Sequence, residues 1–195
     1  MKYTDLQIDG LREMINIGGG NAATSISKMV DEKIDMKIPE VAILSYQELY
    51  QKVMADDVEV YGVISKIVGE YQGAILFVVT DQAIDQLAGL ILKGTEASWD
   101  VKLSAVSELS NIIANSFLNA IGRLLDVQLI SSLPQVKNDF FGALISSAYL
   151  AFDQYDEQVM VIRNEFTYAE KKLDASLFLI PEEGVLDNLI KSLGV

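Results

Sequence analysis

The sequence lacks both cysteine and histidine along its 195 residues. Without cysteine, the chain has no disulfide, no thiolate nucleophile and no Cys-ligated metal. Without histidine, it has no Ser-His-Asp or Cys-His arrangement, no usual general base for neutral pH and no common zinc ligand. Any chemistry must therefore come from carboxylates, amides, hydroxyls or lysine, or from a bound partner.

Positive charge is also scarce, because 15 Lys and Arg residues stand against 28 Asp and Glu, for a formal net charge of −13. The resulting field repels nucleic acid and anionic membrane surfaces, so we expect neither as a partner. Only three prolines occur, and half of the residues are hydrophobic. Such a chain can bury a sizeable core as one compact domain.

Targeting and membrane signals are missing from the sequence. No apolar run approaches the roughly 18 residues that span a bilayer. No basic segment followed by an apolar one opens the chain. We therefore expect a cytoplasmic protein.

The first half predicts a long helix over residues 5–31, where Thr4 and Gln7 have the spacing of a capping box. Glycines 18–20 interrupt this helix, and each costs ~1 kcal/mol relative to alanine, which indicates close approach of another backbone. Strands over 34–38 and 41–44 follow, with a bend at Pro39 between them. A pair of strands over 58–69 and 72–79 and a helix capped by Asp81 and closed by Gly94 complete the half.

The second half repeats this order: a helix over 102–125, a strand over 127–131, a helical stretch over 141–150, strands over 158–168 and 173–180, and a helix over 182–193. Leu76-Phe77 corresponds to Leu177-Phe178, and the stretch 84–87 corresponds to 186–189. This self-similarity predicts an α+β fold in one domain made of two pseudo-repeats, about residues 1–98 and 99–195. Long helices would pack on an antiparallel sheet around a pseudo-two-fold axis.

One polar pattern recurs in both halves with every position displaced by 95 residues. It reads Asp or Ser, three residues, Glu, two residues, Asn, twenty-two residues, Pro. Its members are Asp9, Glu13, Asn16 and Pro39, and then Ser104, Glu108, Asn111 and Pro134. Background residue frequencies give the Glu, Asn and Pro part in roughly 0.02 of chains of this length, so two matches in equivalent places indicate a shared role.

Spacings of four and three residues place the Asp or Ser, the Glu and the Asn of each set on one face of its helix, which we expect to face solvent. The prolines should each end a strand after the helix. Asn21, Asn115 and Asn119 lie nearby at unequal spacings from the signature asparagines, so a direct role is the less favoured alternative for each of them. Apolar neighbours should hold the other helix faces in the core: Ile15, Ile17, Ile112, Ile113, Phe117 and Leu118.

The duplicated pattern resembles the signature of the CheC, CheX and FliY family of chemotaxis phosphatases. The similarity covers nearly the whole chain and includes the glycine-rich stretch 16–23 and Leu179-Ile180-Pro181 before the last helix. Two intact motifs in one chain are typical of the CheC branch. CheX keeps one intact motif, FliY carries an added FliN-like domain, and the flagellar switch protein FliM lacks the paired Glu and Asn.

The resemblance implies a chemotaxis protein phosphatase, a hydrolase of two-component signalling that acts on the aspartyl phosphate of a CheY-like response regulator. Asn16 or Asn111 would position the attacking water, and Glu13 or Glu108 would pair with a receiver lysine and fix the docking. The protein would need no cofactor of its own, because the receiver supplies Mg²⁺. The resemblance also implies CheD deamidase as a partner and a monomeric protein.

Several points stay open on the sequence alone. Asp9 and Ser104 support helix-surface hydrogen bonds or partner contact, or are simply solvated helix residues. An adaptor that binds the receiver or CheD with little catalysis is the alternative function, although the intact Glu and Asn in both motifs argue against it. A structural component of the flagellar switch is a more distant alternative. The sequence does not show which of the two motifs is faster.

Overall fold

The computed structural model describes residues 3–150, 158–168 and 171–194, and within these ranges the chain forms six helices and seven strands. The elements, in chain order, are α1 (Asp5–Val30), β1 (Asp35–Ser45), α2 (Tyr46–Lys52), β2 (Glu59–Gly69), β3 (Gly73–Val79), α3 (Asp81–Ile91), α4 (Trp99–Leu125), β4 (Leu129–Ser131), β5 (Gln135–Phe140), α5 (Phe141–Leu150), β6 (Gln158–Tyr168), β7 (Lys171–Pro181) and α6 (Val185–Ser192).

The strands form one antiparallel sheet in the order β1-β6-β7-β3-β2-β4, with β5 also paired to β2. Each half contributes strands to the hairpin of the other half, since β1 pairs with β6, and β4 and β5 both pair with β2. The central pair is β3 and β7, where Leu76 lies opposite Phe178 and Phe77 opposite Leu177. The repeated Leu-Phe pairs of the two halves therefore lie opposite each other about the pseudo-two-fold axis. The predicted α+β fold is confirmed.

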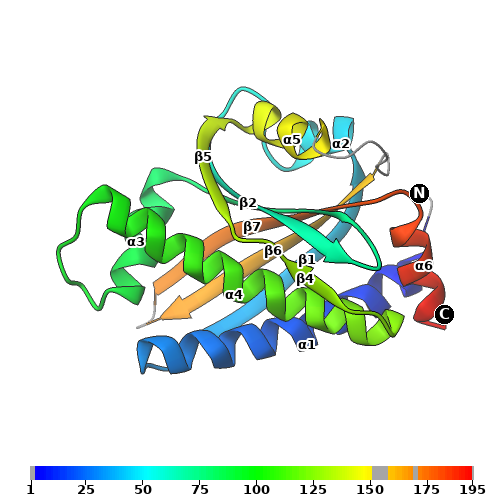
Figure 1. Cartoon of the computed structure of the whole chain (residues 1–195), viewed down its shortest axis with the longest axis horizontal. Helices are drawn as coiled ribbons and strands as arrows, with labels where there is room; N and C mark the ends of the chain where they lie inside the picture. Colours follow the sequence, from blue (N-terminus) through cyan, green and yellow to red (C-terminus); the bar gives the residue numbers. More distant parts are fainter. Residues whose placement is uncertain (1–2, 151–157, 169–170, 195) are drawn as a thin grey trace.

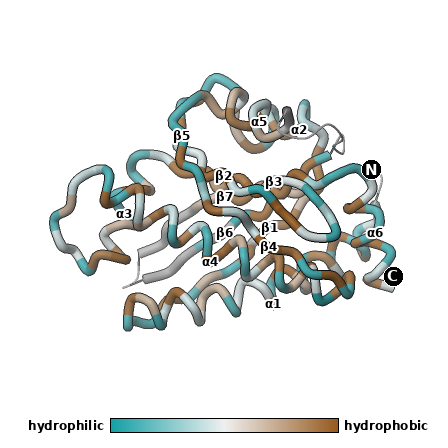
Figure 2. The backbone as a smooth tube through the Cα atoms, in the orientation of Figure 1, coloured by the Kyte–Doolittle hydropathy of each residue, from teal (hydrophilic) through white to brown (hydrophobic). Residues whose placement is uncertain are grey.

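Helices cover both faces of the sheet (Figure 1). The long helices α1 and α4, with α3 and α6, pack on one face and bury the larger core. The short helices α2 and α5 cover part of the other face over a smaller core. Every residue of β3 is buried, as expected for a central strand covered on both sides. Figure 2 shows apolar residues gathered in the strands, while α1 and α4 alternate between apolar and polar along their length.

The ends of α1 and α4 show how the chain fixes these helices. The Thr4 hydroxyl accepts a hydrogen bond from the Gln7 backbone, and the Gln7 side chain accepts one from the Thr4 backbone, so the predicted capping box is present. At the other end, α1 stops at Asp31 and α4 at Asp126, both in the left-handed conformation with φ of 54° and 56°. These two aspartates are displaced by the same 95 residues as the polar pattern.

Several predicted helix boundaries are wrong, each because a neighbouring contact extends or shortens the helix. The helix α4 begins at Trp99, three residues early, because the Trp99 indole packs edge-on against Tyr61 and donates a hydrogen bond to its hydroxyl at 3.2 Å. The cap of α3 is Thr80 rather than Asp81, since the Thr80 hydroxyl accepts from a backbone N–H inside the helix. The last helix starts at Val185, after a left-handed Gly184.

The strand predictions around the two prolines also need correction. Residues 35–45 form one strand rather than two, because the pairing register with β6 shifts between Lys37 and Glu40 and this irregularity accommodates Pro39. Pro134 instead lies between β4 and β5, so only the second proline follows a strand end as predicted. Strand β5 and helix α2 were not predicted at all.

No helix within the described ranges is long and apolar enough to cross a membrane.

Candidate functional site

The two helices that carry the polar pattern lie antiparallel and side by side on the same face of the sheet (Figure 1). Their close approach depends on Gly18, where an added Cβ would lie 2.7 Å from the Phe117 ring and 3.2 Å from the Phe117 Cα. This confirms the prediction that a glycine in α1 serves close backbone approach. The two helices, and the signature faces that they carry, are thereby held close together.

The α1 face, which we define as Asp9, Glu13 and Asn16, is exposed at all three positions, as the spacing predicted. Asp9 accepts a hydrogen bond from Arg12 at 2.7 Å in a surface ion pair. Within residues 3–150, 158–168 and 171–194, neither Glu13 nor Asn16 has a side-chain hydrogen-bond partner. Both side chains are therefore available to a partner that docks on α1.

The α4 face, which we define as Ser104, Glu108 and Asn111, has the same outline with one difference. Ser104 and Glu108 are exposed, but Asn111 is only half-exposed. The Ser104 hydroxyl donates to the Asp100 carbonyl one turn earlier, at 2.9 Å. Ser104 and Asp9 are thus both bonded to their own helices, while Glu108 is available to a partner.

Asn111 is held by contacts that the sequence did not predict. The Asn115 side-chain amide donates to both the backbone oxygen and the side-chain Oδ1 of Asn111, at 2.9 Å each. The Ser131 hydroxyl, from β4, donates to the same Oδ1 at 3.2 Å. The Ser131 backbone N–H donates in turn to Asn115 Oδ1 at 3.4 Å. The side-chain amide of Asn111 is therefore fixed by two neighbours before any partner arrives.

Ile17 is the one predicted core residue that lies mainly in solvent, with 57% of its surface exposed. It lines a groove of about 530 Å³ between α1 and α4, together with Glu13, Met14, Arg123 and Leu124 among others. The prediction for Ile17 failed because the close packing at Gly18 and Gly19 seats the other side of α1 against α4 and the sheet. Ile17 therefore adds apolar surface beside Glu13 on α1.

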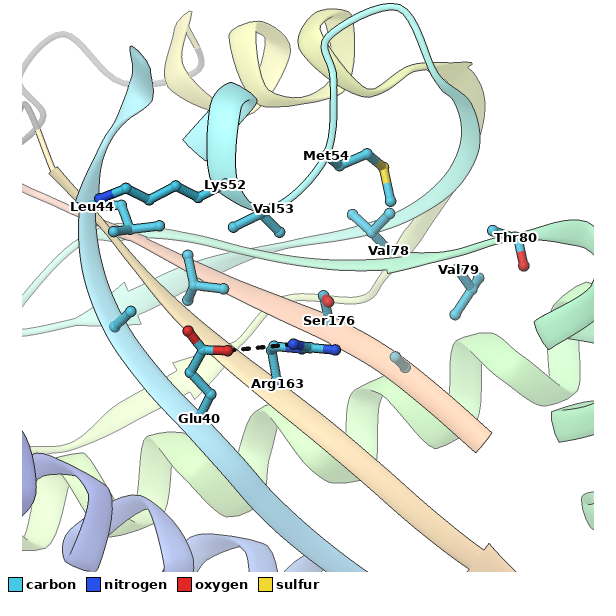
Figure 3. Close-up of a pocket in the computed structure, with 13 residues that line it drawn as sticks. Glu40, Leu44, Lys52, Val53, Met54, Val78, Val79, Thr80, Arg163 and Ser176 are labelled. Carbon is cyan, nitrogen blue, oxygen red and sulfur yellow. Dashed lines mark hydrogen bonds and ion pairs between the residues drawn. The ribbon is translucent and has the colours of Figure 1, made fainter. Parts of the chain in front are cut away.

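A second cavity, of about 320 Å³, lies on the side of the sheet that carries α2 (Figure 3). Val78 and Val161 contribute apolar walls, and an ion pair between Arg163 and Glu40 at 3.4 Å crosses it. It contains none of the six residues of the two signature faces. Both cations that line it, Arg163 and Lys52, are already paired with carboxylates.

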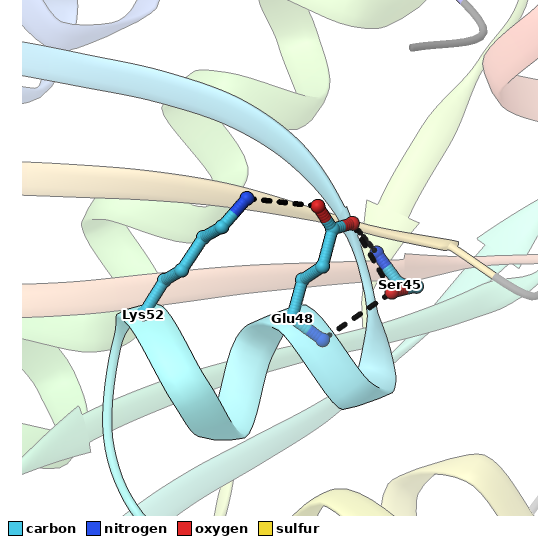
Figure 4. Close-up of polar contacts among 3 residues, drawn as sticks. All are labelled: Ser45, Glu48 and Lys52. Carbon is cyan, nitrogen blue, oxygen red and sulfur yellow. Dashed lines mark hydrogen bonds and ion pairs between the residues drawn. The ribbon is translucent and has the colours of Figure 1, made fainter.

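Ser45, Glu48 and Lys52 form a cluster of polar contacts at the start of α2, near that cavity (Figure 4). Glu48 accepts from Lys52 at 2.8 Å, and from the Ser45 backbone and hydroxyl at 3.1 Å each. These hydrogen bonds lower the pKa of Glu48 to about 2, and the bond from Lys52 has the largest effect. The cluster forms a capping box for α2.

The chemistry open to the two faces is limited to carboxylates and neutral amides. No group of three or more acidic side chains arranged to hold a metal occurs among the residues that the structure describes. An exposed Glu followed one turn later by an exposed or half-exposed Asn suits recognition of a cation together with placement of a water or phosphate oxygen. A neutral amide can approach a phosphoryl group that would repel a carboxylate.

No protein-family model matches the chain, but known proteins are similar to it along most of its length. The CheY-P phosphatase CheC of Bacillus subtilis (strain 168) is 31% identical over 202 residues, which cover 96% of this chain and 94% of that protein. Similarity at this level along nearly the whole of both chains reflects common descent.

Solved structures share the fold. FliY of Thermotoga maritima matches with a TM-score of 0.74 at 20% identity, covering 100% of this chain and 98% of that one. The CheX-CheY-BeF₃-Mg²⁺ complex of Borrelia burgdorferi matches with a TM-score of 0.50 at 14% identity, covering 85% of this chain and 96% of that one.

Proposed function

The chain belongs to the CheC family of CheY-P phosphatases, and from this premise we propose that it hydrolyses the aspartyl phosphate of a CheY-like response regulator at the α1 and α4 faces. The observation that carries the proposal is the duplicated Glu and Asn, exposed or half-exposed at equivalent places on two adjacent helices. A single such pair would be an ordinary helix surface. Two pairs at one displacement, on a chain of this family, support a catalytic role.

The asparagine of each face is the group that we assign to the reaction. With the receiver docked, the amide of Asn16 or Asn111 reaches the phosphoryl group and holds a water in line with the bond that breaks. The water oxygen forms a new bond to phosphorus, and the bond between phosphorus and the aspartyl oxygen breaks. The aspartate leaves as a carboxylate, and both water protons leave with the phosphate.

The glutamate of each face is the group that we assign to docking. An acyl phosphate is already activated, so the enzyme contributes mainly position. Glu13 or Glu108 pairs with a lysine of the receiver, and the receiver brings the Mg²⁺ that neutralises its phosphoryl oxygens. For the α1 face, exposed Ile17 supplies apolar contact area beside Glu13.

The deciding experiment measures phosphate release from a phosphorylated CheY-like receiver. We expect N16A and N111A each to lower the rate and N16A/N111A to lower it about 100-fold or more, as when a transition-state contact is removed. E13Q/E108Q should chiefly raise KM, because it removes a docking charge. N138A replaces an exposed asparagine on β5 and is the matched control.

A double mutant as active as the wild type would refute the assignment of the asparagines. Binding separates the enzyme from an adaptor. If the protein is an enzyme, the wild type releases phosphate, and the N16A/N111A variant loses this activity but still binds a beryllofluoride-loaded receiver in calorimetry. If it is an adaptor, the wild type binds the receiver but releases no phosphate.

We also propose CheD as a second partner, a monomeric state and a cytoplasmic location. Family resemblance supports the first two, and the lack of a targeting signal in the sequence supports the third. Titrating CheD into the phosphate-release assay tests the first, because a regulator of the phosphatase changes its turnover. Light scattering across a concentration series tests the second. Cell fractionation tests the third.

A further inference from the structure

The two signature asparagines differ in what holds them. Asn111 Oδ1 accepts from the Asn115 amide at 2.9 Å and from the Ser131 hydroxyl at 3.2 Å. A carbonyl-type oxygen has two lone pairs, so these two bonds fill it. The Asn111 NH₂ group, with both hydrogens, is left for whatever docks on the α4 face.

The same bonds fix which way the Asn111 amide points. If Asn111 were turned over, its NH₂ would face the Asn115 NH₂, setting two donors against each other. Asn115 is itself oriented by the Ser131 backbone N–H, which donates to its Oδ1. The donor side of Asn111 therefore faces outward before the receiver docks.

The α1 face has no equivalent of the hydrogen bonds from Asn115 and Ser131. The residues displaced by 95 from Asn115 and Ser131 are Gly20 and Met36, and neither side chain can donate a hydrogen bond. The Asn16 side chain is exposed and has no hydrogen-bond partner in the part of the chain that the structure describes. Its amide must be ordered during docking, which loses rotamer freedom.

We propose that Asn115 and Ser131 are positioning residues for Asn111, and that they make the α4 face the preorganised one of the two sites. The inference rests on the proposed phosphatase function and deepens it. Asn111 acts as a donor, with its NH₂ directed to the attacking water and to a phosphoryl oxygen. Neither positioning residue needs to touch the receiver, so both act on turnover rather than on binding.

The loss test isolates the α4 site in an N16A background and measures kcat and KM with the phosphorylated receiver. N115A should lower kcat about 3- to 10-fold, the loss of one or two hydrogen bonds, with KM nearly unchanged. S131A should lower kcat in the same way, and S131T should restore it because threonine keeps the hydroxyl. The exposed N138A is the control.

The gain test places an equivalent of Asn115 on α1, at position 20, in an N111A background where only the α1 site works. A Cβ at position 20 meets nothing within 4 Å and the position is exposed, so a side chain can be introduced there. We expect G20N to raise kcat about 3-fold over G20A. Both variants remove the glycine from the helix, but only G20N supplies an amide that can reach Asn16.

The outcomes are distinct for the two proposals. Full activity in N16A/N111A would sink the phosphatase assignment itself. If that variant is inactive but N115A and S131A keep the kcat of their N16A parent, the positioning role is wrong and the phosphatase assignment stands. A rise in KM in place of the fall in kcat, or G20N no faster than G20A, would also overturn it.

Discussion

Gly18 and Gly20 of α1 give a sharp test of how the two signature helices are held together. They lie two residues apart in one helix, yet a Cβ added at Gly18 would lie 2.7 Å from Phe117 Cδ1 and 3.2 Å from both Phe117 Cα and the Ser116 oxygen. The same Cβ at Gly20 would meet nothing within 4 Å. Phe117 is 1% exposed, so its ring has no free space into which to turn.

The comparison of G18A with G20A isolates this packing. Each variant gains the helix propensity of alanine over glycine, ~1 kcal/mol, and each restricts the unfolded chain equally. Those terms cancel when the two variants are subtracted. The remainder is the overpacking at Gly18, which costs about 1–3 kcal/mol because α1 and α4 must separate or Phe117 must leave its rotamer.

The assay is urea denaturation followed by circular dichroism, with the free energy of unfolding extrapolated to water. We expect G20A to be more stable than the wild type and G18A to be less stable than G20A by about 1–3 kcal/mol. Equal stability of the two variants would refute the close approach at Gly18. A more stable G18A would refute it more strongly.

Two further predictions concern α2 and the turn beside β4. The pKa of Glu48 is lowered to about 2 from 4.5, so its charge stabilises the fold fully above about pH 4.5, and this contribution is lost as the pH falls toward 2. The free energy of unfolding of E48Q should therefore fall less between pH 4.5 and pH 2 than that of the wild type. Added salt should reduce this difference between the two proteins, because the contact with Lys52 is exposed. An E48Q variant whose stability falls with acid as steeply as that of the wild type would contradict this. Gly69 has φ of +140° and its missing Cβ would run into the Gln128 carbonyl oxygen, so G69A should cost about 2 kcal/mol or more in urea denaturation. A G69A variant of wild-type stability would show that this turn is free to shift.

Local sequence was sufficient for the long helices and for the exposure of most signature residues. The spacing of Asp9, Glu13 and Asn16 predicted one solvent face because residues three and four apart share a side of any α-helix. The capping box at Thr4 and the strands of the β2–β3 pair were likewise predicted from neighbours in the chain. The family resemblance also depended on short sequence motifs, each read from neighbouring residues.

Contacts between distant segments were beyond such reasoning. The early start of α4 and the exposure of Ile17 depend on what packs beside them, and no periodicity records that. Helix α2 is different, because its Ser45 and Glu48 have the local spacing of a capping box, a signal that the prediction missed. The difference between the two signature asparagines is the clearest case, because Ser131 reaches Asn111 across 20 residues of sequence. The sequence by itself determined that two equivalent Glu and Asn pairs exist, since helical periodicity is local. Only the tertiary structure, by seating β4 against α4, decided that one of the two amides is held in place.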